Sequence, residues 1–291
     1  MTTIETGTRR LAGTDVYPIG LGGMPMALSG RPPEEQSIRT IHAALDAGVN
    51  LIDTADAYCT DETDIGHNEL LIAEAIRDRR DGVIVATKGG HTRPGGSWAL
   101  DGSPEHLRAA CEASLRALGT DRIDLYQYHR PDPDVPYEES IGAIKELQDE
   151  GKVRWIGISN ANLEQIELAC SIAEVVSVQN QLSLEYPFPL EKGEVELCER
   201  HGIAFLPWSP LGGISKAADA AGGHDPVREA AEAHGVSPQQ VALAWLLSLS
   251  PVMIPIPGAS RPESITDSAK AVELELSHEE LQAIGGVAQT A

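Results

Sequence analysis

The sequence predicts an α/β protein folded as a single (β/α)8 TIM barrel, in which eight parallel strands alternate with helices. Short β-rich runs alternate with longer stretches whose apolar residues recur every three to four positions, a pattern typical of a parallel sheet covered by helices. The alternation fills the 291-residue chain without a linker or a low-complexity segment. We therefore expect one domain spanning residues 1–291.

The predicted strands are eight short runs. In chain order they are Ile19–Gly22, Leu51–Thr54, Val83–Lys88, Asp124–His129, Val153–Ser159, Val176–Gln179, Ile203–Trp208 and Val252–Ile256. Ahead of them, Arg9–Val16 is typical of a β-hairpin turning at Gly13, which we expect to plug the floor of the barrel. The glycine cluster Gly20–Pro25 lacks the third glycine of a dinucleotide-binding turn and has a proline where a helix should open, which argues against a doubly wound sheet.

Capping residues mark several of the predicted helices. Ser103–Gly119 begins with an N-cap serine and a first-turn proline and ends at a glycine, and Ser237 precedes a proline in the same way. Ser260–Glu263 and Ser277–Glu280 have the spacing of a capping box. Each signal predicts where a helix begins.

Two predicted loops are longer than usual, and both follow the carboxyl end of a strand. They are Gly89–Gly102 and Ser209–His224, and both are rich in glycine. In a barrel, the loops that follow the strands surround the active site. We therefore expect both segments to shape a binding site.

Charge and cysteine content exclude several classes of protein. The chain has 22 Lys and Arg against 44 Asp and Glu, a net charge of -22 that repels nucleic acids and anionic membranes. No apolar run approaches the roughly 18 residues of a spanning helix, and the N-terminus lacks the apolar core of a signal peptide, so we expect a cytoplasmic protein. The four cysteines form no C-x-x-C pair and no His-x-His pair occurs, so we expect free thiols and no metal site.

Polar side chains suited to acid–base chemistry stand at the carboxyl ends of three consecutive strands. The second strand ends in Asp53, the third in Lys88 and the fourth in His129, and Tyr58 lies just beyond Asp53. The carboxyl ends of the strands converge on one face of a barrel, so we expect these four side chains to meet.

These residue types suit protonation of a carbonyl oxygen while a hydride reaches the carbonyl carbon. A phenol has a pKa near 10, and an ammonium group beside its oxygen lowers that value. We therefore expect Lys88 to lower the pKa of Tyr58, Asp53 to hold Lys88 charged, and His129 to hydrogen-bond the carbonyl. A lysine at a strand end can also form a Schiff base, so a lyase reaction at Lys88 stays open.

At these residues the sequence resembles the aldo-keto reductase superfamily, and the resemblance covers nearly the whole chain. Gly48–Tyr58 is similar to the family's segment around its catalytic Asp and Tyr, Val85–Gly90 to its lysine segment and Ile123–Pro131 to its histidine strand. Gly151–Asn160 matches a further long motif. The resemblance implies a (β/α)8 barrel that reversibly reduces aldehydes or ketones with NAD(P)H, with Tyr58 as the general acid.

The resemblance also implies a set of cofactor-binding residues on the loops that follow the strands. They are Gly23, Met24, Asp53, Ser159, Asn160, Gln179, Trp208, Ser209, Leu211, Gly213, Gly258, Ser260, Arg261 and Ser264. We expect NADP(H). NAD(H) stays open, because glycine and serines stand where NADP-preferring members commonly carry basic residues, which leaves Arg261 and Lys270 as cations.

The substrate pocket is outlined by loop residues around the four catalytic side chains. They are Met24, Cys59, His91, Trp98 and Trp208, and the catalytic His129 is expected to face the same pocket. Just past Tyr58, the acidic run Asp61, Glu62, Asp64 and Glu69 is expected to discourage anionic substrates.

The resemblance leaves alternatives open. Some family members bind NADP(H) as slow-turnover regulatory subunits, so a binding role competes with catalysis. The loop lengths and the short carboxyl-terminal tail are similar to those of bacterial members, including a pyridoxal-reductase-like branch. The resemblance implies a monomer that acts on a small carbonyl compound, and we expect no nucleic-acid or membrane partner.

Overall fold

A seven-stranded parallel sheet forms the centre of the computed structural model, which describes residues 7–213 and 225–288. In the order of their pairing the strands are β11 (Ala204–Phe205), β10 (Val175–Gln179), β9 (Val153–Ser159), β8 (Ile123–Tyr128), β5 (Ile84–Gly89), β4 (Leu51–Asp53) and β3 (Leu21–Gly22). Each coincides with a predicted strand, although β3 and β11 are shorter than expected. The predicted parallel α/β architecture is therefore confirmed.

The eighth predicted strand, Val252–Ile256, does not form a regular strand, so this prediction is wrong. The segment and the residues just after it nevertheless form hydrogen bonds to both edge strands, β11 and β3. The amide of Phe205 donates to the carbonyl of Val252 at 2.8 Å on one side, and the amide of Gly22 donates to the carbonyl of Pro257 at 2.9 Å on the other. Prolines at positions 255 and 257 have no amide proton, so a complete ladder cannot form here. The barrel closes through single bridges.

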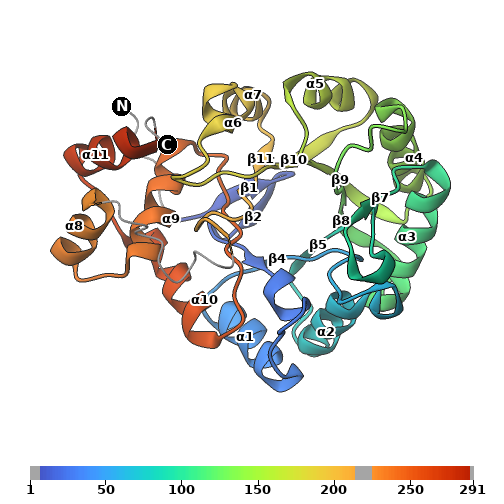
Figure 1. The fold of residues 1–291 in the computed structure, drawn as a ribbon, viewed down its shortest axis with the longest axis horizontal. Helices are drawn as coiled ribbons and strands as arrows, with labels where there is room; N and C mark the ends of the chain where they lie inside the picture. Colours follow the sequence, from blue (N-terminus) through green and yellow to red (C-terminus); the bar gives the residue numbers. More distant parts are fainter. Residues whose placement is uncertain (1–6, 214–224, 289–291) are drawn as a thin grey trace.

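Helices surround the sheet, as Figure 1 shows. In chain order they are α1 (Glu34–Asp46), α2 (His67–Ile76), α3 (Pro104–Leu118), α4 (Tyr137–Asp149), α5 (Leu163–Ile172), α6 (Phe188–Glu191), α7 (Glu194–His201), α8 (Asp225–His234), α9 (Pro238–Leu249), α10 (Pro262–Ala269) and α11 (His278–Ala288). In α3, Leu107, Cys111 and Leu115 recur at helical spacing and are buried against the core. None of the described helices has the length and apolar character needed to span a membrane.

The predicted N-terminal hairpin is confirmed. β1 (Arg9–Leu11) and β2 (Thr14–Val16) pair antiparallel, and Leu11 and Val16 pack in one buried cluster with side chains of the barrel strands. Arg9 is buried as well, and its guanidinium donates to the carbonyl of Leu247 at 3.1 Å. The hairpin therefore fills one end of the barrel.

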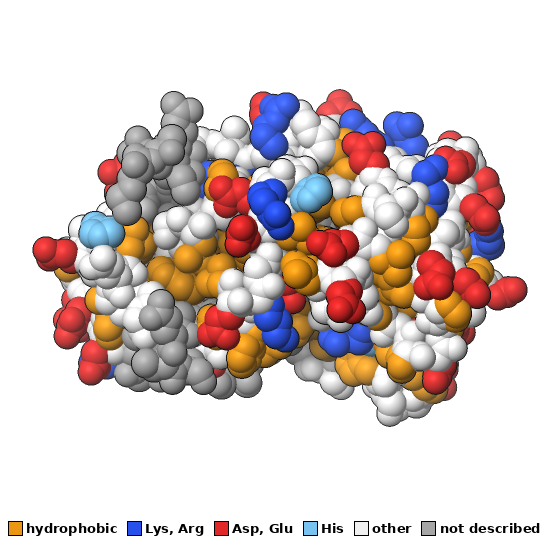
Figure 2. Space-filling model, turned by 90° about the horizontal axis from the view of Figure 1, so that it is seen from above, with side chains coloured by type: hydrophobic (Ala, Val, Ile, Leu, Met, Phe, Trp, Pro, Cys, Tyr) orange, Lys and Arg blue, Asp and Glu red, His pale blue; other side chains and the backbone are white. Residues whose placement is uncertain are grey.

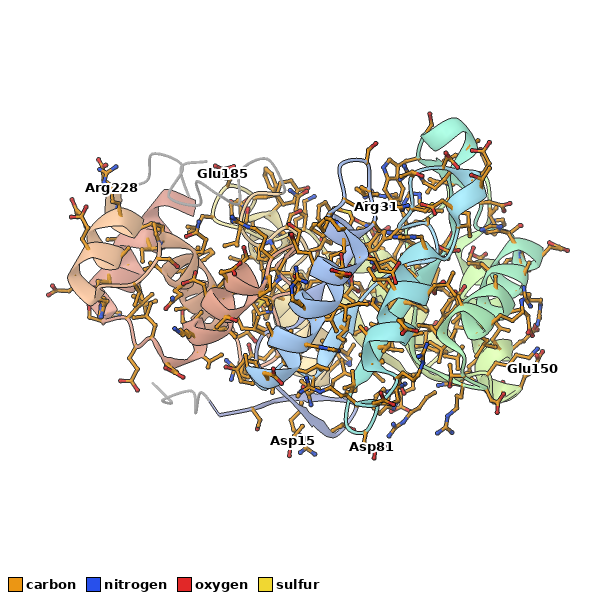
Figure 3. The ribbon with its side chains drawn as sticks, turned by 90° about the horizontal axis from the view of Figure 1, so that it is seen from below. Asp15, Arg31, Asp81, Glu150, Glu185 and Arg228 are labelled. Carbon is orange, nitrogen blue, oxygen red and sulfur yellow. The ribbon has the colours of Figure 1, made fainter. Side chains whose placement is uncertain are left out.

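The two ends of the barrel carry different kinds of loop. In Figure 3, Asp15 of the hairpin and Asp81 ahead of β5 lie at one end, whereas Arg31 and Glu185 lie at the other. Arg31 follows β3 and Glu185 follows β10. The carboxyl ends of the strands thus open on the end opposite the hairpin, where barrels carry their sites.

Three of the four predicted helix starts are confirmed by hydrogen bonds from backbone amides to the capping hydroxyl. The three capping residues are Ser103 of α3, Ser237 of α9 and Ser277 of α11. The capping box at Ser260 is wrong, because α10 has Arg261 as its N-cap and no side-chain cap bond. Proline favours the first helical position, and α10 opens with one, so the N-cap falls on the residue just before it.

The two long loops differ in how much of each the structure describes. Gly89–Gly102 contains a short antiparallel pair, β6 (His91–Thr92) and β7 (Ala99–Leu100), which the sequence did not indicate. Ser209–His224 is described only as far as residue 213. Residues 214–224, like residues 289–291 of the tail, lie outside the described part.

Candidate active site

Asp53, Tyr58 and Lys88 are in contact at the carboxyl ends of β4 and β5. The Lys88 ammonium donates to Asp53 Oδ2 at 2.7 Å, to the carbonyl of Thr54 at 2.8 Å and to the Tyr58 hydroxyl at 3.1 Å. Lys88 is fully buried, and Asp53 and Tyr58 are nearly so. Three acceptors use the three ammonium protons, which fixes the cation beside the phenol oxygen.

Burial and charge compete at this cluster. Burial alone lowers the pKa of Lys88, but Asp53 and Tyr58 outweigh it and the net shift is upward. Burial is also the largest effect on Tyr58 and raises its pKa, while Lys88 acts in the opposite direction. The expectation of a lowered pKa at Tyr58 is therefore wrong, because desolvation of the phenolate outweighs the ammonium. Tyr58 keeps its proton at neutral pH.

Two amide side chains hold the other oxygen of Asp53. Gln127 from β8 and Gln179 from β10 donate to Oδ1 at 3.2 and 2.7 Å. Gln127 is fully buried and was not among the predicted site residues. Its signal in the sequence is the alternation of a strand, which points residue 127 to the same face as His129.

Gly157 of β9 leaves the space that Gln127 occupies. A Cβ at this position would lie 2.8 Å from Gln127 Cγ and 2.3 Å from Ser177 Oγ. A larger residue would displace Gln127 and, through it, the carboxylate of Asp53.

His129 stands beside Tyr58, with 5.8 Å between the ring centroids. Burial holds the pKa of His129 well below its usual value, and Lys88, His91 and Arg130 add to the effect. Its Nδ1 is buried and has no hydrogen-bond partner among the described residues. An unpaired acceptor is less costly than an unpaired N–H, so the single proton of the neutral ring belongs on Nε2.

A cleft with a volume of about 830 Å³ extends from Tyr58 and His129 to the start of α10. Most of the predicted site residues line it. They are Met24, Asp53, Tyr58, His91, Trp98, His129, Ser159, Asn160, Gln179, Trp208, Ser209, Leu211, Gly213, Gly258, Ser260, Arg261 and Ser264.

Three predicted site residues do not line the cleft. Lys88 lies behind Tyr58, and Gly23 uses its amide in a 2.8 Å bond to the carbonyl of Asp53. Cys59 is fully buried, and its thiol donates to the carbonyl of Ala57 at 3.4 Å. Burial raises the pKa of Cys59 to about 11, so the predicted pocket role for this side chain is wrong and its thiol stays protonated.

A hydrogen-bonded cluster of polar side chains floors the cleft beside His129. Asn160 Nδ2 donates to the carbonyl of His129 at 2.9 Å and to Ser159 Oγ at 3.0 Å, and Trp208 Nε1 donates to Asn160 Oδ1 at 3.2 Å. Asn160 and Ser209 have φ values of 57° and 50°, a backbone conformation that side chains other than glycine seldom adopt. Such strain clusters at functional sites.

The far end of the cleft is formed by α10. Arg261 lines it together with Ser264 and the acids Glu263 and Asp267. Asp267 accepts two hydrogen bonds at 2.6 Å from side chains around the start of α9. Lys270, the other cation expected here, does not line the cleft.

The acidic run past Tyr58 also lies away from the cleft. Asp64 pairs with Arg31 at 2.5 Å, and Glu69 is buried in α2, where it accepts a hydrogen bond from the Thr87 hydroxyl at 2.5 Å. Burial raises the pKa of Glu69 to about 7. Neither these residues nor Asp61 and Glu62 line the cleft, so the run makes no contact with a substrate bound there, and its expected effect on anionic substrates stays a prediction.

Known proteins resemble this chain over almost its full length. An uncharacterized oxidoreductase of Schizosaccharomyces pombe is 36% identical over 284 residues, which cover 94% of this chain and 88% of the relative. A glycerol dehydrogenase from Gluconobacter oxydans matches with a TM-score of 0.83 at 27% identity, covering 97% of this chain and 95% of its own.

A third relative is an aldo/keto reductase from Klebsiella pneumoniae, solved in complex with NADP and acetate. It matches with a TM-score of 0.81 at 28% identity and covers 97% of this chain and 95% of its own. None of these three relatives is named a pyridoxal reductase. Residues 18–289 match the Aldo/keto reductase family, and the chain belongs to that family.

Proposed function

We propose that this protein reversibly reduces an aldehyde or ketone to an alcohol with NADP(H), and that Tyr58 is the general acid. The observation that carries the proposal is the Tyr58 hydroxyl, 3.1 Å from the buried Lys88 ammonium and at the wall of the cleft. His129, neutral and beside it, completes the group.

Each of the four residues has a defined part in the reaction. The bound cofactor supplies the hydride. Tyr58 donates its proton to the carbonyl oxygen, and the Lys88 ammonium stabilises the phenolate left behind. Asp53 keeps Lys88 charged and oriented. His129 donates from Nε2 to the same oxygen and so orients and polarises the carbonyl.

The residues at the floor of the cleft fit a nicotinamide group. Gln179 Nε2 is bonded to Asp53, and its Oε1 has no partner among the described residues, so it can accept from a carboxamide. Ser159 and Asn160 add a hydroxyl and an amide beside it, and Trp208 offers a ring for stacking. Glycines at 212 and 213 have positive φ, which allows their backbone to approach a pyrophosphate closely.

NADP(H) is the proposed cofactor because Arg261 lines the end of the cleft where α10 begins, and because a relative was solved with NADP. Arg261→Ala should weaken NADPH about tenfold or more and NADH much less, as expected for loss of a charge-assisted hydrogen bond. Titrations that follow quenching of tryptophan fluorescence measure both affinities, with Lys270→Ala as the control. If Arg261→Ala weakened the binding of NADPH and NADH equally, Arg261 would not bind the 2′-phosphate of NADPH. NAD(H) would then be the alternative cofactor.

Tyr58→Phe tests the reaction itself. It removes one 3.1 Å bond to Lys88 and leaves the ring, so kcat for an aldehyde should fall at least about a hundredfold while NADPH binding persists. Tyr126→Phe is the matched control, because Tyr126 is a buried tyrosine with one 3.3 Å bond to the carbonyl of Leu107 and does not line the cleft. Equal activity of Tyr58→Phe and wild type would refute the assignment.

Two alternatives are weaker. A Schiff base at Lys88 needs a neutral and accessible amine, whereas this amine is fully buried, has a raised pKa and donates to three acceptors. A slow-turnover regulatory subunit would bind NADPH tightly and reduce no aldehyde. Measuring NADPH binding and aldehyde reduction by the wild type distinguishes this role from catalysis.

We further propose that the enzyme is a cytoplasmic monomer with one domain spanning residues 1–291. All four cysteines are free, as expected in a reducing compartment. The cleft suits a small carbonyl compound as substrate. Size-exclusion chromatography with light scattering tests the oligomeric state.

A further inference from the structure

Basic side chains gather around the two histidines at the reactive end of the cleft, although the protein carries a net charge of -22. Burial is the main cause of the lowered pKa values of His91 and His129. The charged neighbours that contribute to these shifts are all basic, with Arg130 and Lys88 acting on both rings and Arg93 on His91. Arg130 and Arg93 are thus the basic neighbours of these rings that the Lys88–Asp53 pair does not include.

Within the described residues, no unpaired carboxylate lines this end of the cleft to balance Arg130 and Arg93, although Asp61 interacts electrostatically with Arg93 from outside the cleft. Asp53 is the acidic side chain that lines this end of the cleft, and it is paired with Lys88 at 2.7 Å. The other acids of the cleft wall, Glu263 and Asp267, belong to α10 at the opposite end.

Arg130 directly follows His129 and lines the cleft. One of its guanidinium nitrogens donates to Asn160 Oδ1 at 3.0 Å, and no carboxylate in residues 7–213 or 225–288 forms an ion pair with it. The charge of Arg130 is therefore available to a ligand.

Arg93 adds a second cation behind the wall of the cleft. It is 6% exposed, and its Nε and Nη1 are buried without a hydrogen-bond partner in the described structure. Its guanidinium carbon lies 4.0 Å from the ring centroid of Trp98, which lines the cleft 6.4 Å from the ring of Tyr58. Its Nη2 donates to the carbonyls of Thr60 and Gly96 at 3.2 and 2.7 Å, so among the described residues neutral acceptors and no carboxylate hold this buried cation, which raises the potential on the cleft side of Trp98.

We propose that the carbonyl substrate carries an anionic oxygen group, a carboxylate or a phosphate, that Arg130 binds at the mouth of the cleft while Arg93 adds to the attraction. The inference rests on the proposed reductase function and names its substrate class. The planar guanidinium fork of arginine matches the paired oxygens of either group. Because Arg130 adjoins His129, the carbonyl and the anion belong to one small molecule.

Three aldehydes of similar shape separate charge from size. They are para-formylbenzoate, para-formylphenyl phosphate and the neutral methyl para-formylbenzoate. With NADPH, wild-type kcat/KM should be about tenfold or more higher for at least one anion than for the ester, mainly through KM. The anion that is preferred identifies the carboxylate-bearing or the phosphate-bearing class.

Variants at Arg130 locate the effect. Arg130→Gln should lower the anion-to-ester ratio of kcat/KM about tenfold or more, and Arg130→Lys should retain part of the ratio because the charge stays while the fork is lost. Arg154→Gln is the matched control: Arg154 is exposed, stacks on the Trp155 ring at 3.9 Å and belongs to the start of β9, at the other end of the strands. It should leave the ratio unchanged.

Binding without turnover gives an independent measurement. Calorimetry with the alcohol product para-(hydroxymethyl)benzoate should show binding to the wild type that weakens between about 0.05 and 0.5 M NaCl, and weaker binding to Arg130→Gln. Equal reduction of ester and anions, or a ratio that Arg130→Gln does not change, overturns the inference and leaves the reductase function standing. If the wild type reduces none of the three aldehydes, the proposed function fails instead, and calorimetry alone decides whether the anion site exists.

Discussion

Replacing Lys88 by Met tests whether a buried ion pair holds the catalytic cluster together. Lys88 is fully buried and lies 2.7 Å from Asp53, whose side chain is 4% exposed. Its loss leaves a buried carboxylate without a charge partner and the carbonyl of Thr54 without this donor, and breaking such a pair costs about 3–5 kcal/mol. At about 2–4 °C per kcal/mol for a domain of this size, Tm should fall by about 6–20 °C.

A double variant separates the charge from the packing. Asp53→Asn removes the charge and keeps an oxygen that accepts from Gln127 and Gln179. Thermal unfolding followed by circular dichroism should therefore show that Lys88→Met with Asp53→Asn loses less than the sum of the single variants, by about 2–3 kcal/mol. Lys145→Met, at an exposed pair within α4, is the control and should cost at most about 1 kcal/mol. A Lys88→Met variant that melts with the wild type would refute this reasoning.

Two further substitutions test buried groups near the site. Burial raises the pKa of Glu69 from 4.5 to about 7, so the stability that its protonated form contributes is complete below about pH 4.5 and is lost as pH rises through 7. In urea unfolding, the free energy of unfolding of the wild type should fall by about 3 kcal/mol between about pH 5 and 8. Glu69→Gln should remove this pH dependence, whereas Glu74→Gln, at an exposed residue, should leave it unchanged. Gly157→Ala places a Cβ 2.3 Å from a hydroxyl and should cost about 1–3 kcal/mol and lower kcat. Gly142→Ala, in α4 with nothing within 4 Å, should be neutral or stabilising, and the reverse order of these two variants would contradict the packing argument.

The catalytic cluster could be predicted from the sequence because barrel topology brings strand ends together whatever their separation along the chain. Asp53 and Lys88 end consecutive strands, and that position alone led to the 2.7 Å pair that the structure contains. Helix starts at Ser103, Ser237 and Ser277 could be predicted for a local reason, since a capping hydroxyl acts on amides two or three residues away.

The remaining features depend on quantities that residue types do not carry. Cys59 adjoins Tyr58 in the chain, yet the tyrosine lines the cleft and the cysteine is fully buried. The pKa of Tyr58 depends on how far desolvation exceeds the effect of Lys88, which only the depth of burial determines. Strand alternation places Gln127 on the face of His129, but its role as a donor to Asp53 is recognised only once the two side chains are placed opposite each other.

The many acidic residues of the chain and the few basic residues at its cleft act over different distances. Figure 2 shows Asp and Glu side chains spread over the face in view, with Lys and Arg among them. Surface charges are screened over about 8–10 Å at physiological ionic strength, whereas Lys88 and Arg93 are buried and act through a medium that screens them less. A net charge of -22 therefore disfavours extended polyanions, which contact a wide surface, but it does not determine the sign of a small molecule inside the cleft. Local cations decide that sign, and a small anion can be preferred in a strongly acidic protein.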